Sequence, residues 1–135
     1  PYFLDVQAMQ KAAQTLVGES DFSSFRAAGC QARSTQRRIN RIEISQEHRP
    51  QVHITVEGNA FLQHMVRIIV GSLVDVGRGA RTIEWLADAL AARDRTAAGP
   101  TAPPHGLFLE QVHYEPTPFS SEHWTHSLTP SVDSA

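Results

Sequence analysis

The chain has 135 residues, 41% of them hydrophobic, which is enough for one domain with a buried core. A formal net charge of -2 and a single cysteine exclude a strongly basic protein, an internal disulfide and a cysteine-based metal cluster. The apolar run over residues 61–76 is short and interrupted by polar residues, and no charged and apolar leader opens the chain. We therefore expect a cytoplasmic protein without membrane contact.

The basic residues are unevenly distributed. Eleven of the twelve are arginines, and residues 26–81 carry nine arginines against four acidic residues. Arginine makes planar, forked contacts with phosphate, so this stretch suits a nucleic-acid partner. A coding bias toward arginine explains the composition equally well.

The first predicted element is a helix over residues 5–16, which Asp5 can cap and whose apolar residues recur on one side. Residues 18–36 are small and polar. They predict an irregular arm in which Phe22 and Phe25 anchor one helical turn.

Alternating apolar residues over 39–44 and 52–56 predict two strands joined as an antiparallel hairpin. A central helix is predicted over residues 61–76. Thr82 is placed to cap a further helix over residues 83–93, which ends before a loop rich in alanine and proline.

Residues 106–114 begin apolar and then alternate, which predicts a final strand. We expect residues 1–115 to form one lobe and residues 116–135, rich in proline, serine and threonine, to form a flexible tail. The order helix, strand, strand, helix, helix, strand predicts an α+β fold, in which an antiparallel sheet carries helices on one face.

The central helix contains one arginine, Arg67, among Met65, Val66, Ile68 and Ile69. An arginine cannot lose its proton, so its burial without a partner is strongly destabilising. We expect an anion there: an internal carboxylate, a reacting carboxylate or a ligand phosphate. The aspartates of the chain lie in capping, helix-surface or tail contexts, which favours a partner outside the chain. They are Asp5, Asp21, Asp75, Asp88, Asp94 and Asp133.

Other chemistry has less support. The five histidines before the tail show no helical spacing of three or four residues, and His123 and His126 lie in the expected tail without a nearby set of acidic partners, so we expect no metal site. The glycines at 77 and 79 lack the lysine and preceding strand of a phosphate-binding loop, and no Gly-x-Ser-x-Gly motif occurs. Residues 26–41 hold five arginines and no acid, which suits either an RNA backbone or a solvated or interface surface.

The chain contains four separated motifs that together resemble those of a known protein family. Their order and spacing agree with that family over residues 3 to about 115. They are Gly18-Glu-Ser-Asp-Phe-Ser-Ser-Phe-Arg26 with Cys30-Gln-Ala-Arg33, Asn59-Ala-Phe-Leu-Gln-His-Met-Val-Arg67 with Ile69-Val-Gly-Ser-Leu73, Ala92-Arg-Asp-Arg-Thr96, and Gly106-Leu-Phe-Leu109. Together they resemble the carboxy-terminal half of the tRNA pseudouridine synthases of the TruA type.

The resemblance implies isomerisation of uridine to pseudouridine in the anticodon stem-loop, through an aspartate that attacks the nucleotide, with no cofactor or metal. It implies that Arg67 pairs with this aspartate and that Leu107 lies in the strand that packs on the target base. The residues expected to face the RNA are Arg26, Arg33, Arg37, Arg38 and His64.

The chain departs from the family pattern in one respect. The amino-terminal Arg-Thr-Asp-x-Gly-Val-His segment with the catalytic aspartate, and the strand with the base-packing tyrosine, have no counterpart. We therefore expect a lobe that is inactive alone and whose partners are the tRNA anticodon arm, the missing amino-terminal lobe and a second copy in a homodimer. The alternative is a non-catalytic RNA-binding or dimerisation module.

Overall fold

The structure is a computed structural model that describes residues 4–29, 32–47, 52–62, 64–102, 107–113 and 122–128, the last two ranges as backbone. The helical elements are α1 (Val6–Gln14), η1 (Ser23–Phe25), α2 (Met65–Gly77), α3 (Ile83–Ala92) and η2 (Arg95–Ala97), where η marks a single 3-10 turn. The strands are β1 (Gly18–Asp21), β2 (Gln36–Ser45), β3 (Val52–Gly58), β4 (Leu107–His113) and β5 (Glu122–Leu128).

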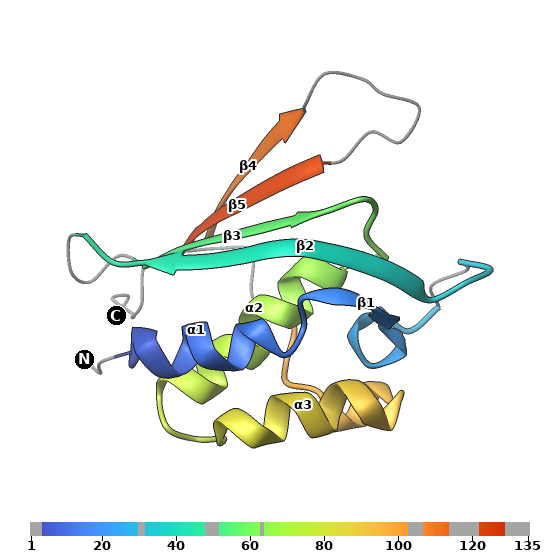
Figure 1. Ribbon diagram of the computed structural model, residues 1–135, viewed down its shortest axis with the longest axis horizontal. Helices are drawn as coiled ribbons and strands as arrows, with labels where there is room; N and C mark the ends of the chain where they lie inside the picture. Colours follow the sequence, from blue (N-terminus) through green and yellow to red (C-terminus); the bar gives the residue numbers. More distant parts are fainter. Residues whose placement is uncertain are drawn as a thin grey trace.

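The described elements form two layers (Figure 1). One layer is a five-stranded antiparallel sheet with the order β1-β2-β3-β5-β4, and α1, α2 and α3 lie together on one of its faces. The predicted α+β fold with helices on one side of an antiparallel sheet is therefore confirmed.

The β2–β3 hairpin sets the apolar face of the sheet. Ile42 pairs with Val56, and both side chains are buried against the helices. A register shift between Ile39 and Arg41 inserts an extra residue into β2. Because side chains alternate along a strand, this bulge lets Ile39 and Ile42, three positions apart, both face the core.

The two shorter helices begin at the predicted caps. The Asp5 carboxylate accepts a hydrogen bond from the Ala8 N–H of α1 over 3.1 Å, and the Thr82 hydroxyl accepts one from the Trp85 N–H of α3 over 3.1 Å. Each side chain satisfies a backbone donor that the first turn of a helix leaves without an internal partner.

Helix α2 is the central element of the helical layer, and ten of its residues are buried. It begins at Met65, four residues later than the predicted start at Phe61, because His64 adopts a left-handed conformation with φ 63°. A left-handed residue cannot continue a right-handed helix, so the apolar residues before it belong to a loop.

The segment over residues 95–102 lies directly on α2. The Gly99 N–H donates to the Ser72 hydroxyl over 2.9 Å, and a Cβ atom at Gly71 would lie only 1.8 Å from the Pro100 carbonyl oxygen. Figure 1 shows this segment rising from the end of α3 past α2 toward the sheet. A glycine at position 71 is therefore what allows the segment to contact the helix backbone.

Two strands lie where the sequence predicted no regular structure. β1 falls in the polar arm over residues 18–36, and β5 falls in the predicted tail, where it pairs with both β3 and β4. The strand at residues 122–128 was not predicted, residues 116–121 and 129–135 lie outside the described ranges, and the flexibility of the tail stays a prediction. The proposed boundary at residue 115 stays a prediction.

The close approach at Gly71 gives a test of the fold. We expect Gly71→Ala to lower the free energy of unfolding by about 3 kcal/mol, since the new methyl group meets backbone that cannot move without detaching the segment. Gly77→Ala is the matched control, because the atoms nearest to a Cβ there are side-chain atoms of Met9 and Leu4 and not backbone. Equal effects of the two changes in chemical denaturation would contradict this packing.

Candidate active site and nucleic-acid interface

Arg67 and Ala102 form a reciprocal pair of hydrogen bonds. The Nε of Arg67 donates to the Ala102 carbonyl oxygen over 2.9 Å, and the Ala102 N–H donates to the Arg67 carbonyl oxygen over 2.9 Å. Because Nε lies in the plane of the guanidinium group, this bond fixes the direction of the whole group. Both Nη groups stay available to an acceptor, since no hydrogen bond joins them to the described residues.

The position of Arg67 in α2 leaves its charge without local compensation. It is the third residue of the helix, whose first turn contains no acidic residue. A cation is unfavourable at a helix N-terminus, where the backbone dipoles place partial positive charge. Among the described side chains, no carboxylate oxygen lies within 4 Å of its nitrogens. The surroundings therefore favour an anion.

The sequence prediction of an enclosed Arg67 needs a correction. The neighbouring Met65, Val66, Ile68 and Ile69 are buried as expected, but Arg67 itself is only half-buried. The helix turns its side chain toward the segment over residues 95–102 and not into the apolar core. Partial exposure leaves the guanidinium group accessible from outside the chain.

The described aspartates engage other groups. Asp5 caps α1, Asp75 pairs with Arg78 over 3.1 Å, and Asp94 accepts hydrogen bonds from Thr96. Asp88 lies exposed on α3, and Asp133 is outside the described residues. These positions confirm the prediction of capping and helix-surface roles, and none of them provides a partner for Arg67.

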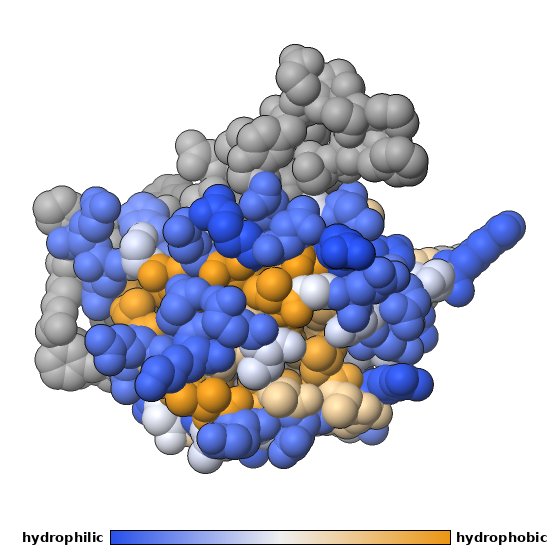
Figure 2. Space-filling model, viewed as in Figure 1, coloured by the Kyte–Doolittle hydropathy of each residue, from blue (hydrophilic) through white to orange (hydrophobic). Residues whose placement is uncertain are grey.

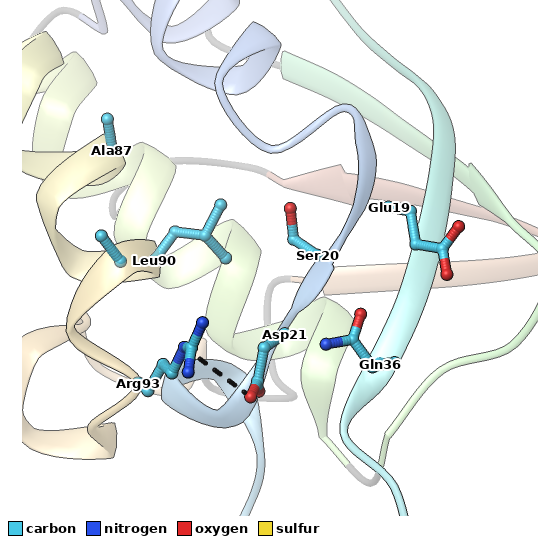
Figure 3. Close-up of a pocket in the computed structure, with 8 residues that line it drawn as sticks. Glu19, Ser20, Asp21, Gln36, Ala87, Leu90 and Arg93 are labelled. Atoms are coloured by element: carbon cyan, nitrogen blue, oxygen red, sulfur yellow. Dashed lines mark ion pairs between the residues drawn. The ribbon is translucent and has the colours of Figure 1, made fainter.

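Asp21 lies beside a cavity of about 420 Å³ between β1 and α3. Its carboxylate accepts hydrogen bonds from the hydroxyl groups of Ser23 and Thr35, which hold its pKa below the ordinary value. Figure 3 shows Arg93, at the end of α3, turned toward Asp21, with 3.9 Å between Arg93 Nε and the second carboxylate oxygen. Through these bonds Asp21 holds Ser23, just after β1, close to Thr35, just before β2.

His64 and Leu107 are two further residues of the predicted site. His64 is exposed and precedes α2, and its side chain makes no capping hydrogen bond. Leu107 is the first residue of β4, where its backbone pairs with Leu128, and its side chain lies outside the described part of the structure. Their expected contacts with RNA and with the target base stay predictions.

The arginine-rich strand β2 is less free than its sequence indicates. Arg38 pairs with Glu19 of β1 over 3.3 Å, and Arg41 pairs with Glu57 of β3 over 3.2 Å and with Glu43 of β2. The Glu57 carboxylate raises the pKa of Arg41. Residues 26–41 contain no acidic residue, but in the folded structure glutamates of β1 and β3 lie beside two of their arginines.

Three of the candidate RNA-facing arginines have no carboxylate within 4 Å among the described residues. Arg26 is half-buried and Arg33 is exposed, and both lie in the arm between η1 and β2. Arg37 donates from Nη1 to the carbonyl oxygens of Ser34 and Gln36. Figure 2 shows hydrophilic surface over β2 and the arm beside it.

No group of three or more histidine, cysteine or acidic side chains among the described residues is arranged to hold a metal ion. In the same part of the chain, no helix has both the length and the apolar character needed to cross a membrane.

The two-layer α+β fold is consistent with the family that comparison with known proteins finds. A family model described as tRNA pseudouridine synthase matches residues 12–115. The chain therefore belongs to the tRNA pseudouridine synthase family.

The curated relatives within this family are named tRNA pseudouridine synthase A. The chain is 50% identical to the Myxococcus xanthus protein over 115 residues, which are 85% of this chain and 43% of that protein. It is 53% identical to the Ralstonia nicotianae protein over 111 residues, 82% of this chain and 40% of that protein. The chain thus spans about two fifths of the length of the curated relatives it matches.

The Asp21 carboxylate gives a prediction about pH. A pKa held below the ordinary 3.8 stabilises the fold while the carboxylate is ionised, and this contribution is lost as pH falls below that value. We expect Asp21→Asn to lower the free energy of unfolding by about 2 kcal/mol at pH 7, with the difference from the parent protein shrinking toward zero below pH 3.8. Asp88→Asn, on exposed helix surface, is the control. A difference that stayed constant with pH would contradict the ionised hydrogen-bonded role.

Proposed function

We propose that this chain is the carboxy-terminal half of a tRNA pseudouridine synthase that converts uridine to pseudouridine in the anticodon stem-loop. The observation that carries the proposal is the orientation of Arg67 and its lack of a carboxylate partner. Its guanidinium group is oriented by Ala102, is half-buried at the start of α2, and has no carboxylate partner among the described residues. Membership of the family and coverage of two fifths of its relatives support the assignment.

In this proposal the amino-terminal part of the enzyme supplies an aspartate to Arg67. Hydrogen bonds from the two Nη groups favour the ionised carboxylate and lower its pKa, so the aspartate stays available as a nucleophile at neutral pH. The aspartate attacks the nucleotide, and the base leaves, turns and rejoins the ribose through carbon, which releases the aspartate again. The rejoining carbon loses its proton, and the nitrogen that left the ribose gains one. The reaction is an isomerisation, and in this proposal it uses the aspartate alone, with no cofactor or metal.

The RNA-binding surface is proposed for the arm and for the start of α2. Arg26, Arg33 and Arg37 have charge that no described carboxylate neutralises, whereas Arg38 would have to exchange Glu19 for phosphate. His64, exposed beside α2, is proposed to face the RNA near Arg67. Leu107 is proposed to pack on the target base.

We also propose that the complete enzyme acts in the cytoplasm as a homodimer, and that this chain alone does not isomerise uridine. The rival functions are an RNA-binding module and a dimerisation module without catalysis. The two experiments below separate them from an enzyme half, because a module needs neither an added aspartate nor Arg67 for its activity.

A fusion protein tests the enzymatic assignment. We expect this chain preceded by the amino-terminal part of the Myxococcus xanthus relative to form pseudouridine in unmodified tRNA, and the 135-residue chain alone to form none. In the fusion, Arg67→Met should lower kcat by about 10²–10³-fold, because the attacking carboxylate loses its partner. Arg78→Met, on the exposed end of the same helix, should retain the activity. Turnover by the chain alone would refute the proposal.

The salt dependence of tRNA binding tests the RNA surface. Each arginine that contacts a phosphate releases counterions, so its loss lowers the slope of log affinity against log salt by about one unit. We expect this for Arg33→Gln and no change for Arg41→Gln, since Arg41 is already paired with Glu57. Filter binding of tRNA to the fusion protein across a salt series measures both. Equal slopes in all three proteins would favour a protein-contact role for the arm.

A further inference from the structure

We propose that Arg95 and Ser72 are positioning residues that aim Arg67, an inference that rests on the proposed function. They act on the Gly99 peptide groups, at the middle of the segment that carries Ala102 past α2. Neither residue contacts the guanidinium group itself. Their effect passes through the backbone to the Ala102 carbonyl oxygen, which accepts the Arg67 Nε–H over 2.9 Å.

Ser72 fixes one side of Gly99. Its side chain is fully buried, and its hydroxyl donates to the Ile68 carbonyl oxygen over 2.8 Å while accepting from the Gly99 N–H over 2.9 Å. A buried donor left without an acceptor is costly, so the Gly99 N–H has a strong reason to stay at this hydroxyl. Ser72 thus ties the segment to the backbone of α2 one turn after Arg67.

Arg95 fixes the other side of Gly99. Its Nη1 donates to the Gly99 carbonyl oxygen over 2.8 Å, and its Nη2 donates to the Thr101 hydroxyl over 3.3 Å. It is half-buried, and no carboxylate among the described side chains pairs with it. Its guanidinium group therefore bridges the Gly99 carbonyl oxygen and the Thr101 hydroxyl, on either side of Pro100.

The close contact at Gly71 makes this arrangement stiff. The Pro100 carbonyl oxygen lies so near Gly71 that a methyl group there has no room, and a Cβ at Gly99 would lie 2.9 Å from the Ser72 Cα. The N–H and the carbonyl oxygen of Gly99 are both hydrogen-bonded, and the Ala102 N–H is bonded to the Arg67 carbonyl oxygen. The Ala102 carbonyl group therefore has little freedom to rotate. A small rotation of it would move the guanidinium group.

Such a displacement matters because a reacting carboxylate must be held in one place. Misplacement of a catalytic group by about 1 Å lowers a rate by as much as about 100-fold, even when binding is intact. Loss of positioning should therefore appear in kcat and leave the affinity for tRNA unchanged. Loss of an RNA contact would appear mainly in the affinity.

The test uses the fusion protein for activity and the 135-residue chain for a structural readout. We expect Arg95→Gln and Ser72→Ala to lower kcat by about 10–100-fold with tRNA affinity within about twofold of the parent protein. Arg95→Lys, which retains one charged donor for the Gly99 carbonyl oxygen, should recover part of the loss. Arg78→Gln is the matched control and should behave as the parent protein.

The structural readout is the exchange of the Arg67 Nε–H with water, measured by NMR and assigned by its loss in Arg67→Lys. We expect exchange at least about 10-fold faster in Arg95→Gln and Ser72→Ala than in Arg78→Gln, because the Ala102 acceptor no longer holds the proton. Where Arg95→Gln fails to fold, Arg95→Lys and Ser72→Ala carry the comparison.

The outcomes separate this inference from the proposed function. Unchanged kcat in the variants of an active fusion would overturn the inference alone. Lost activity with unchanged Arg67 exchange would also overturn it, because Arg95 would then act directly. An inactive parent fusion would count against the proposed function, and the exchange rates would still decide whether Arg95 and Ser72 hold Arg67.

Discussion

The reciprocal hydrogen bonds between Arg67 and Ala102 are the constraint on which the candidate site depends. They join the first turn of α2 to the end of the segment over residues 95–102, so the helix and this segment share one fixed point. Gly71 permits the close approach by having no side chain. An arginine on the same helix without such an acceptor would sweep through many rotamers and present no defined direction to a partner.

The lack of a carboxylate partner among the described residues distinguishes Arg67 from Arg38, Arg41 and Arg78. Arg38, Arg41 and Arg78 meet carboxylates from their own or neighbouring elements, and their exposed ion pairs add little to stability. Arg67 instead uses its Nε for a carbonyl oxygen, and its two Nη groups have no hydrogen-bond partner among the described residues. In the proposed function this guanidinium group is half of an ion pair, and the chain covers only about two fifths of the length of its relatives.

Local patterns predicted most of the fold, and pairing across the sheet explains what they missed. The caps at Asp5 and Thr82 and the alternation in β2 and β3 are readable because each depends on a few adjacent residues. β1 has no apolar alternation, since its four residues are held by backbone pairing with β2. The role of Ala102 was also invisible, because a backbone carbonyl carries no signature in the sequence. Arg67 was identifiable from its apolar neighbours, but its half-buried state follows from where the 95–102 segment lies.

The most direct measurement of the central claim is a crystal structure of the fusion protein that joins this chain to the amino-terminal part of the Myxococcus xanthus relative. We expect a carboxylate from the amino-terminal part within about 3 Å of the Arg67 Nη atoms, with Nε still bound to the Ala102 carbonyl oxygen. An Arg67 whose Nη atoms face only solvent, or pair with an aspartate of this chain, would contradict the claim that the guanidinium group is held in place for an external carboxylate.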